Sequence, residues 1–288
     1  MSSGAGNFSG VSKLKPNMVG RFVFNTAMIV FSVVNVFPII WMVYSSLKTK
    51  QEYLINVFAL PSRFLISNYF DAIRVGKLHI GLLNSVLNST VAVASIVVLA
   101  FVIGYCFARF SFPGKKIIYT LLIAGMLIPI HALMVPLFIQ FRQLNLINRQ
   151  FTLVLPYIAF GLPLAVFLME GFIRQMPTEV EEAAWIDGSS FFNTLLLVVA
   201  PMSRPVISTA IIIAFMDAWN EFSFALILIS NEQFKTLPVF LTGFAGIYTV
   251  DFTKMFAALV IATMPVLILY IFLSNKIIEG MVAGAVKG

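Results

Sequence analysis

Residues 84–116 read NSVLNSTVAVASIVVLAFVIGYCFARFSFPGKK. Residues 78–108 contain no Asp, Glu, Lys or Arg. A helix needs about 20 predominantly apolar residues to cross the hydrocarbon core of a bilayer. The stretch therefore predicts a membrane-spanning helix at residues 82–108. The span ends in a tight basic loop, RFSFPGKK, at residues 109–116.

The composition of the whole chain agrees with this interpretation. Of 288 residues, 60% are hydrophobic and 11% are charged, whereas an ordinary soluble domain has about 45–50% and about 25%. A soluble fold of this length could not bury so much apolar surface. We therefore expect an all-α integral membrane protein. The single Cys106 excludes an internal disulfide and matches no metal-ligand spacing.

Working outward from residues 84–116, five more apolar stretches are long enough to cross the membrane. The sixteen uncharged residues 188–203 are shorter, and we interpret them as an interfacial or slanting helix that leads into the fifth span. Residues 47–80 mix aromatic and charged side chains and predict a small folded loop outside the membrane. The six predicted spans are residues 22–46, 82–108, 117–140, 151–173, 205–230 and 255–275.

With six spans both chain ends lie on one side of the membrane. Lys and Arg are distributed almost evenly between the two sides, so the basic loop 109–116 is the best local argument for orientation. We place that loop, the N-terminal tail 1–21, the loop 174–204 and the C-terminal tail 276–288 in the cytoplasm. Residues 22–275 then form the transmembrane domain.

An acidic segment, TEVEEAAWIDGSS at residues 178–190, interrupts this apolar sequence. Four of the twelve acidic residues of the chain, Glu179, Glu181, Glu182 and Asp187, lie within it. Thr178 precedes Glu181 by three positions, which is the spacing of a capping box. Gly188 is placed to end the helix in a left-handed conformation. These signals predict a helix at residues 179–187.

The spacing of several residues in and after this segment resembles a family signature. The sequence reads Glu182-Ala183-Ala184, three residues, Gly188, nine residues, Val198, one residue, and Ala200-Pro201. This resembles the EAA motif of membrane subunits of binding-protein-dependent ABC importers, in which Ile and Leu stand where this chain has Val198 and Ala200. The segments 84–116, 218–230, 236–239 and 279–288 are similar to the carbohydrate-uptake branch, the maltose-type permeases.

The resemblance implies that residues 22–275 are a permease domain in a bacterial inner membrane. It also implies that the acidic segment is the coupling helix, which docks on a cytoplasmic ATPase subunit. The implied coupling residues are Glu181, Glu182, Ala183, Ala184, Asp187, Gly188 and Pro201. The implied partners are a second permease subunit, two ATPase copies, an extracytoplasmic solute-binding protein and a sugar, with the chain surrounded by lipid. We expect no cofactor on this chain, since it lacks a phosphate-binding G-x-x-x-x-G-K-[ST] motif. ATP and Mg would bind the ATPase.

Asp217 and Glu221 are the two acidic residues inside the fifth predicted span; they lie four positions apart on one helical face, with Asn220 beside them. An acid at mid-membrane costs roughly 2.5–3.5 kcal/mol on insertion scales, so such groups usually face a cavity or a partner. Two interpretations stay open: the three residues line a sugar pathway, or they form a structural hydrogen-bond network with neighbouring spans.

We therefore predict that this chain forms half of the translocation pathway of an ATP-driven importer of di- or oligosaccharides. The alternative is an ion-coupled secondary transporter that uses Asp217 and Glu221, although no clear inverted repeat supports it. A scaffold protein would leave the acidic helix unexplained. An enzyme is least favoured, because the sequence shows no nucleophile–base pair and no metal cluster.

Overall fold

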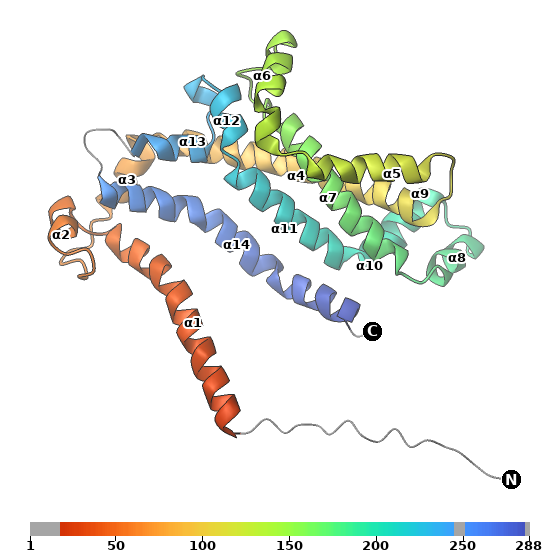
Figure 1. The fold of residues 1–288 in the computed structure, drawn as a ribbon, viewed down its shortest axis with the longest axis horizontal. Helices are drawn as coiled ribbons and strands as arrows, with labels where there is room; N and C mark the ends of the chain where they lie inside the picture. Colours follow the sequence, from red (N-terminus) through yellow and green to blue (C-terminus); the bar gives the residue numbers. More distant parts are fainter. Residues whose placement is uncertain (1–17, 245–250, 286–288) are drawn as a thin grey trace.

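The computed structural model describes residues 18–244 and 251–285, with residues 19 and 273–285 described as backbone alone. Within these ranges the chain forms helices and no strand (Figure 1). Four helices are each long and apolar enough to cross a membrane, and two bent pairs of helices would raise the number of spans to six. The predicted all-α fold with several apolar spans is confirmed.

The four long helices correspond to four of the predicted spans. Their bounds are α1 Met18–Ser45, α4 Leu78–Arg109, α7 Val154–Arg174 and α14 Phe252–Ala285. Helix α14 runs beyond the predicted end of its span at residue 275, so part of the predicted C-terminal tail continues this helix. Residues 286–288 of that tail lie outside the described residues.

The third predicted span, 117–140, is broken. Helices α5 (Lys115–Ala124) and η1 (Gly125–Leu127) run up to Pro129, and η2 (Ile130–Leu133) and α6 (Met134–Gln143) follow it at an angle of 94°. Pro129 adopts an extended conformation and has no N–H to continue the helical ladder. The run length predicted the segment, but the proline bends it.

The fifth predicted span, 205–230, is also interrupted. Helix α11 (Arg204–Asn220) stops where Glu221 turns to an extended conformation, and a separate short helix, α12 (Ser223–Leu228), follows. Residues 188–203, predicted as a slanting helix, contain α9 (Phe191–Asn193), η3 (Thr194–Val199) and α10 (Ala200–Met202). Together these three meet α11 at an angle of 77°.

The core lies where α4 and α7 pack against each other and against α11. Gly104 makes the close approach possible, because a Cβ atom there would lie 2.7 Å from Met169 Cβ. Buried side chains of α4, α7, η3 and α11 form one apolar cluster that includes Tyr105, Ile173 and Val199. Tyr105 of this cluster contacts the acidic segment through Glu181.

The loop 47–80 is folded, as the sequence predicts. It contains α2 (Lys50–Ile55) and α3 (Ser67–Arg74). Lys48 is only 1% exposed and its Nζ donates to the carbonyl oxygen of Val57 at 2.8 Å. Asn68 Nδ2 donates to the carbonyl oxygens of Ser46 and Lys48. These bonds fold the loop over the end of α1.

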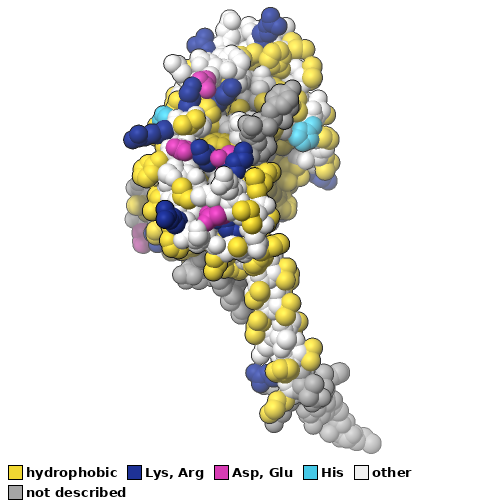
Figure 2. All heavy atoms as spheres, turned by 90° about the vertical axis from the view of Figure 1, so that its left-hand side faces the viewer, with side chains coloured by type: hydrophobic (Ala, Val, Ile, Leu, Met, Phe, Trp, Pro, Cys, Tyr) yellow, Lys and Arg dark blue, Asp and Glu magenta, His cyan; other side chains and the backbone are white. Residues whose placement is uncertain are grey.

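Helix α1 extends away from the other helices (Figure 1). None of its apolar membrane-length window is buried within this chain. Figure 2 shows the end of the molecule that carries α2 and α3, where charged side chains of both signs gather, while hydrophobic side chains cover α1 below. The remaining short elements are η4 Glu232–Phe234, α13 Leu237–Leu241 and η5 Thr242–Phe244.

Candidate functional site

The acidic segment forms α8, Glu179–Ile186, at the end of the molecule opposite α2 (Figure 1). The helix ends at Ile186, with Asp187 as its C-cap, and is therefore one residue shorter than the predicted helix 179–187. Gly188 follows with φ +82°, and the Ser189 amide donates to the Ala184 carbonyl oxygen at 2.9 Å. The predicted left-handed glycine at the end of the helix is confirmed.

The predicted capping box at the start of α8 is wrong. Thr178 has helical backbone angles and its side chain accepts no capping hydrogen bond. The Glu181 carboxylate does not reach back to the chain before it, because other groups bind it in the interior. Among the described residues, a capping box does form at the start of α2, between Thr49 and Glu52.

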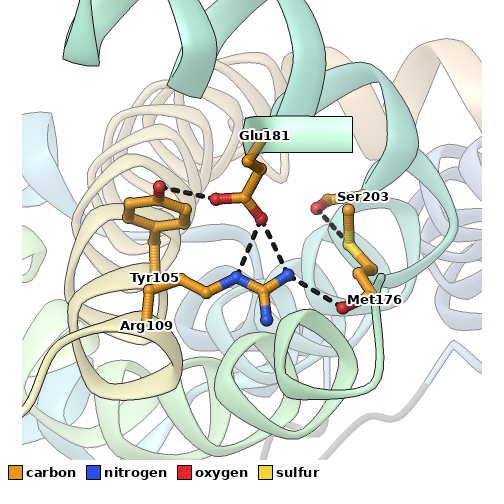
Figure 3. Close-up of polar contacts among 5 residues, drawn as sticks. All are labelled: Tyr105, Arg109, Met176, Glu181 and Ser203. Carbon is orange, nitrogen blue, oxygen red and sulfur yellow. Dashed lines mark hydrogen bonds and ion pairs between the residues drawn. The ribbon is translucent and has the colours of Figure 1, made fainter. Parts of the chain in front are cut away.

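Glu181 is the residue that fixes α8 to the core (Figure 3). It is 2% exposed. The Tyr105 hydroxyl donates to Glu181 Oε2 at 2.8 Å, and Arg109 Nε donates to Oε1 at 2.8 Å. Arg109 Nη2 lies 2.7 Å from the same Oε1. Both partners project from the last two turns of α4, so a buried ion pair joins α8 to a membrane-length helix.

The same arginine also holds the end of α7. Arg109 Nη2 donates to the carbonyl oxygen of Met176 at 3.0 Å. The Met176 sulfur in turn lies 3.7 Å from the hydroxyl of Ser203, which is fully buried between α10 and α11 (Figure 3). We call these five residues, Tyr105, Arg109, Met176, Glu181 and Ser203, the anchor cluster. It links α4, α7, α8 and the start of α11.

Apart from Glu181, most of α8 is exposed. Glu182 and Ala183 are exposed, and Ala184 is half-buried. Trp185 is 47% exposed and Ile186 is 86% exposed. The Glu182 carboxylate has no hydrogen-bond or ion-pair partner among residues 18–244 and 251–285. The helix therefore presents a carboxylate beside large apolar side chains, which is a composition typical of a surface that another protein covers.

Pro201 lies in the bend between the segment after α8 and α11. It stands near the end of the continuous helical segment Phe191–Met202, where its missing N–H leaves one helical hydrogen bond unmade. Just before it, the η3 segment adopts π-helical geometry. Helix α8 is thus connected to α11 in two ways. One is the backbone of η3 and α10, which leads into α11, with η3 packed against the core. The other is the anchor cluster.

The predicted pathway residues do come together. Asp217, Asn220 and Glu221 line one cavity of about 410 Å³, with Tyr157 and Phe160 of α7 in its wall. Carboxylate and amide groups beside aromatic rings can bind the hydroxyls and the apolar face of a sugar. The cavity lies between α7 and α11, within the part of the chain that spans the membrane.

Within this cavity Glu221 and Asp217 have different roles. Glu221 caps α12, because its carboxylate accepts from the amides of Phe224 at 2.6 Å and Ala225 at 3.2 Å. The Tyr157 hydroxyl donates to it at 3.3 Å. Asp217 makes no hydrogen bond or ion pair with any described residue. Glu221 thus fits the structural interpretation, and Asp217 is the carboxylate that stays open to the cavity.

Sequence reasoning missed Tyr105 and Arg109 as site residues. They lie in the stretch GYCFAR, which was interpreted as the end of a span. A polar Tyr and a basic Arg four positions apart share a helical face, and that face could have been matched to a carboxylate nearby. Tyr157 was likewise missed, because a lone tyrosine in an apolar span gives no distinctive signal.

Comparison with known proteins gives a consistent result. The family model described as binding-protein-dependent transport system inner membrane component matches residues 96–281. The chain is 32% identical over 90% of its length, and 87% of the relative, to a diacetylchitobiose uptake system permease protein of Streptomyces coelicolor. It is 27% identical over 96% of its length to the whole trehalose/maltose transport system permease protein of Thermococcus litoralis.

A solved structure shares the fold. A chain of a bacterial ABC transporter involved in the import of the acidic polysaccharide alginate superposes with a TM-score of 0.78. The match covers 89% of this chain and 96% of that one, at 20% identity. At this identity the likeness concerns the arrangement of the helices.

Proposed function

Because this chain belongs to the family of binding-protein-dependent transport system inner membrane components, we propose that it is a membrane-spanning subunit of an ATP-driven importer of di- or oligosaccharides. The relatives are permease proteins of sugar uptake systems. The chain is accordingly a transport subunit and not an enzyme, and it is an inner-membrane component. The ion-coupled alternative is not favoured by these relatives.

Helix α8 is the element through which the ATPase acts on this subunit. The observation that carries this proposal is the contrast between its two faces: Glu181 is bound in the core, whereas Glu182 is exposed beside Trp185 and Ile186. A lever needs a firm attachment on one side and a free docking surface on the other. A charge-assisted hydrogen bond from Glu182 to a basic group on the ATPase would be worth about 1.5–3 kcal/mol.

Two routes carry movement of α8 into the membrane. The first is direct, from Glu181 to Tyr105 and Arg109 on α4. The second follows the chain past Gly188 and Pro201 into α11. Since α4 and α11 both pack against α7, displacement of α8 would shift the three helices as one block.

The cavity between α7 and α11 is the proposed contribution of this chain to the sugar pathway. Asp217 and Asn220 offer polar groups to the sugar, and Tyr157 and Phe160 offer ring surfaces. Glu221 contributes by holding α12 in place at the break that opens the cavity.

The remaining parts of the proposal concern the assembly. A second permease subunit, two copies of an ATPase subunit that bind ATP and Mg, and an extracytoplasmic solute-binding protein complete the transporter. Both termini and the loop 174–204 are cytoplasmic, the loop 47–80 is external, and the tail 276–288 lies against the ATPase pair.

The test is uptake by the reconstituted complex. Proteoliposomes that contain this chain, its partner permease and the ATPase should accumulate labelled sugar when the binding protein and internal ATP are supplied, with a protonophore present. Uptake by this chain alone that a protonophore abolishes would establish the ion-coupled alternative instead.

A further inference from the structure

We propose that the junction of α4 and α5 holds the phosphate headgroup of an anionic phospholipid. A cavity of about 560 Å³ opens there, at the same end of α4 as Arg109 but away from the anchor cluster. The cavity is lined in part by Phe107, Phe112, Lys115, Lys116, Tyr119 and Arg174, and we call it the basic pocket.

The charge of the basic pocket favours an anion. Three cationic side chains line it, and one of them, Arg174, forms an ion pair with the buried carboxylate of Glu170. Lys115 Nζ donates to the Phe110 carbonyl oxygen at 2.8 Å, which leaves two of its three N–H groups for other acceptors. Lys116 is exposed and has no partner among residues 18–244 and 251–285. The pocket therefore carries an uncompensated positive charge.

The backbone adds to this charge. Gly114 has φ +79° and turns the chain so that α5 begins at Lys115, inside the pocket lining. The first N–H groups of a ten-residue helix carry the positive end of its dipole, which favours a bound phosphate. The helix start and the lysines thus point to the same ligand chemistry.

The walls of the pocket and the helix beyond it distinguish a lipid from a soluble anion or an acidic protein segment. The rings of Phe107 and Tyr119 meet edge to face with centroids 5.2 Å apart, and Phe112 lies beside them. Farther along α5, Ile117 and Leu121 are 66% and 68% exposed, and their spacing places them on one face. A headgroup site that continues into an exposed apolar stripe is suited to a phosphate that carries acyl chains.

The position in the fold agrees with this choice. The pocket lies where a membrane-length helix ends and the next apolar segment begins, which is the depth of lipid headgroups. Basic pockets between membrane helices at that level bind anionic headgroups in other proteins. This inference does not depend on the proposed sugar transport or on the role of α8.

The experiment compares lipid binding by the purified full chain and its variants, using native mass spectrometry with phosphatidylglycerol as the probe. The double variant Lys115→Gln, Lys116→Gln should bind phosphatidylglycerol at least fivefold more weakly than the unaltered chain. The charge-retaining variant Lys115→Arg, Lys116→Arg should bind normally. The matched control, Arg142→Gln with Lys235→Gln, removes two positive charges outside the basic pocket, one on α6 and one near the start of α4, and should also bind normally.

Two further arms identify the source of the phosphate. Phosphatidylcholine should bind equally to all variants, and millimolar inorganic phosphate should not displace phosphatidylglycerol. Equal phosphatidylglycerol binding by the glutamine double variant, or an equal loss in the control, would overturn the proposal. Displacement by inorganic phosphate would show a soluble-anion site, and loss of the bound lipid when the ATPase assembles would show that an acidic protein surface occupies the pocket. Either outcome would also overturn it.

Discussion

Arg109 and Glu181 are 72 positions apart in the sequence, yet Arg109 Nη2 lies 2.7 Å from Glu181 Oε1 in the interior. Their side chains are 11% and 3% exposed, so water screens the pair little. The pair attaches the acidic helix to the end of α4 and so to the packed helices of the subunit. The exposed remainder of α8 is then free to meet another protein.

Removing one charge of this pair should destabilise the subunit strongly. Glu181→Gln keeps the shape of the side chain but leaves Arg109 buried without a counter-charge, a loss of roughly 3–5 kcal/mol. Thermal unfolding of the detergent-solubilised chain measures it. Glu179→Gln, on the exposed side of the same helix, should change the unfolding temperature little.

A double-mutant cycle tests whether Arg109 is responsible. Arg109→Gln and Glu181→Gln should be non-additive by at least about 1 kcal/mol, because the second substitution removes a partner that is already lost. Additivity within about 0.5 kcal/mol would mean that the two side chains stabilise the fold independently.

Gly188→Val should impair coupling by changing the backbone rather than a charge. The residue has φ +82°, a conformation that costs an L side chain about 1–2 kcal/mol per residue and a β-branched one more. We expect reduced sugar-stimulated ATP hydrolysis with normal membrane insertion. Gly171→Val is the matched control, since Gly171 lies within α7 and no atom within 4 Å obstructs a Cβ there. Equal effects of the two substitutions would contradict a special role for the turn.

Substitutions of Asp217 and Glu221 should have different effects, one on sugar uptake and the other on stability. Asp217→Asn should lower sugar uptake at least several-fold without lowering the unfolding temperature, because no described residue binds its carboxylate. Glu221→Gln weakens the cap of α12 and should lower the unfolding temperature, since capping bonds are worth about 0.5–2 kcal/mol. The test measures sugar uptake and the unfolding temperature of both variants. If Asp217→Asn lowered the unfolding temperature but left uptake normal, Asp217 would be a structural residue and not part of the sugar pathway.

The folded loop after α1 should respond to acid through Glu52. Hydrogen bonds, first from the Ser62 hydroxyl and then from the Thr49 amide, lower the pKa of Glu52 from 4.5 to about 2. A depressed pKa stabilises the fold above the unfolded value, and that contribution fades as the pH falls from 4.5 towards 2. The hydrogen-exchange protection factors of residues 49–62, which are corrected for the pH dependence of the intrinsic exchange rate, should therefore fall over this range. In Glu52→Gln the protection factors should already be low and should change little with pH; a fall equal to that of the unaltered chain would exclude Glu52 as its source.

The sequence predicted those features that depend on run length and local chemistry. Uncharged runs located the long helices α4, α7 and α14, and Gly188 located the end of α8. The break at Glu221 was missed, because an apolar run continues through it. At Pro129 the proline itself marks a helix break, but the sequence does not give the 94° angle between the two halves. The capping box at Thr178 was wrong because Tyr105 and Arg109, distant in the sequence, compete for the same carboxylate. Such long-range partners of Glu181 are set by the packing of α4, which local spacing does not encode.

The most direct test of the coupling proposal is co-purification of the ATPase with two variants of α8. Glu182→Ala removes the exposed carboxylate that we assign to the ATPase contact, at about 1.5–3 kcal/mol. Association should weaken roughly ten- to hundred-fold, with membrane insertion and the unfolding temperature of the subunit unchanged. Glu179→Ala, an exposed acid on the same helix, should retain normal association. Normal ATPase association of Glu182→Ala, with normal sugar-stimulated ATP hydrolysis, would contradict the account.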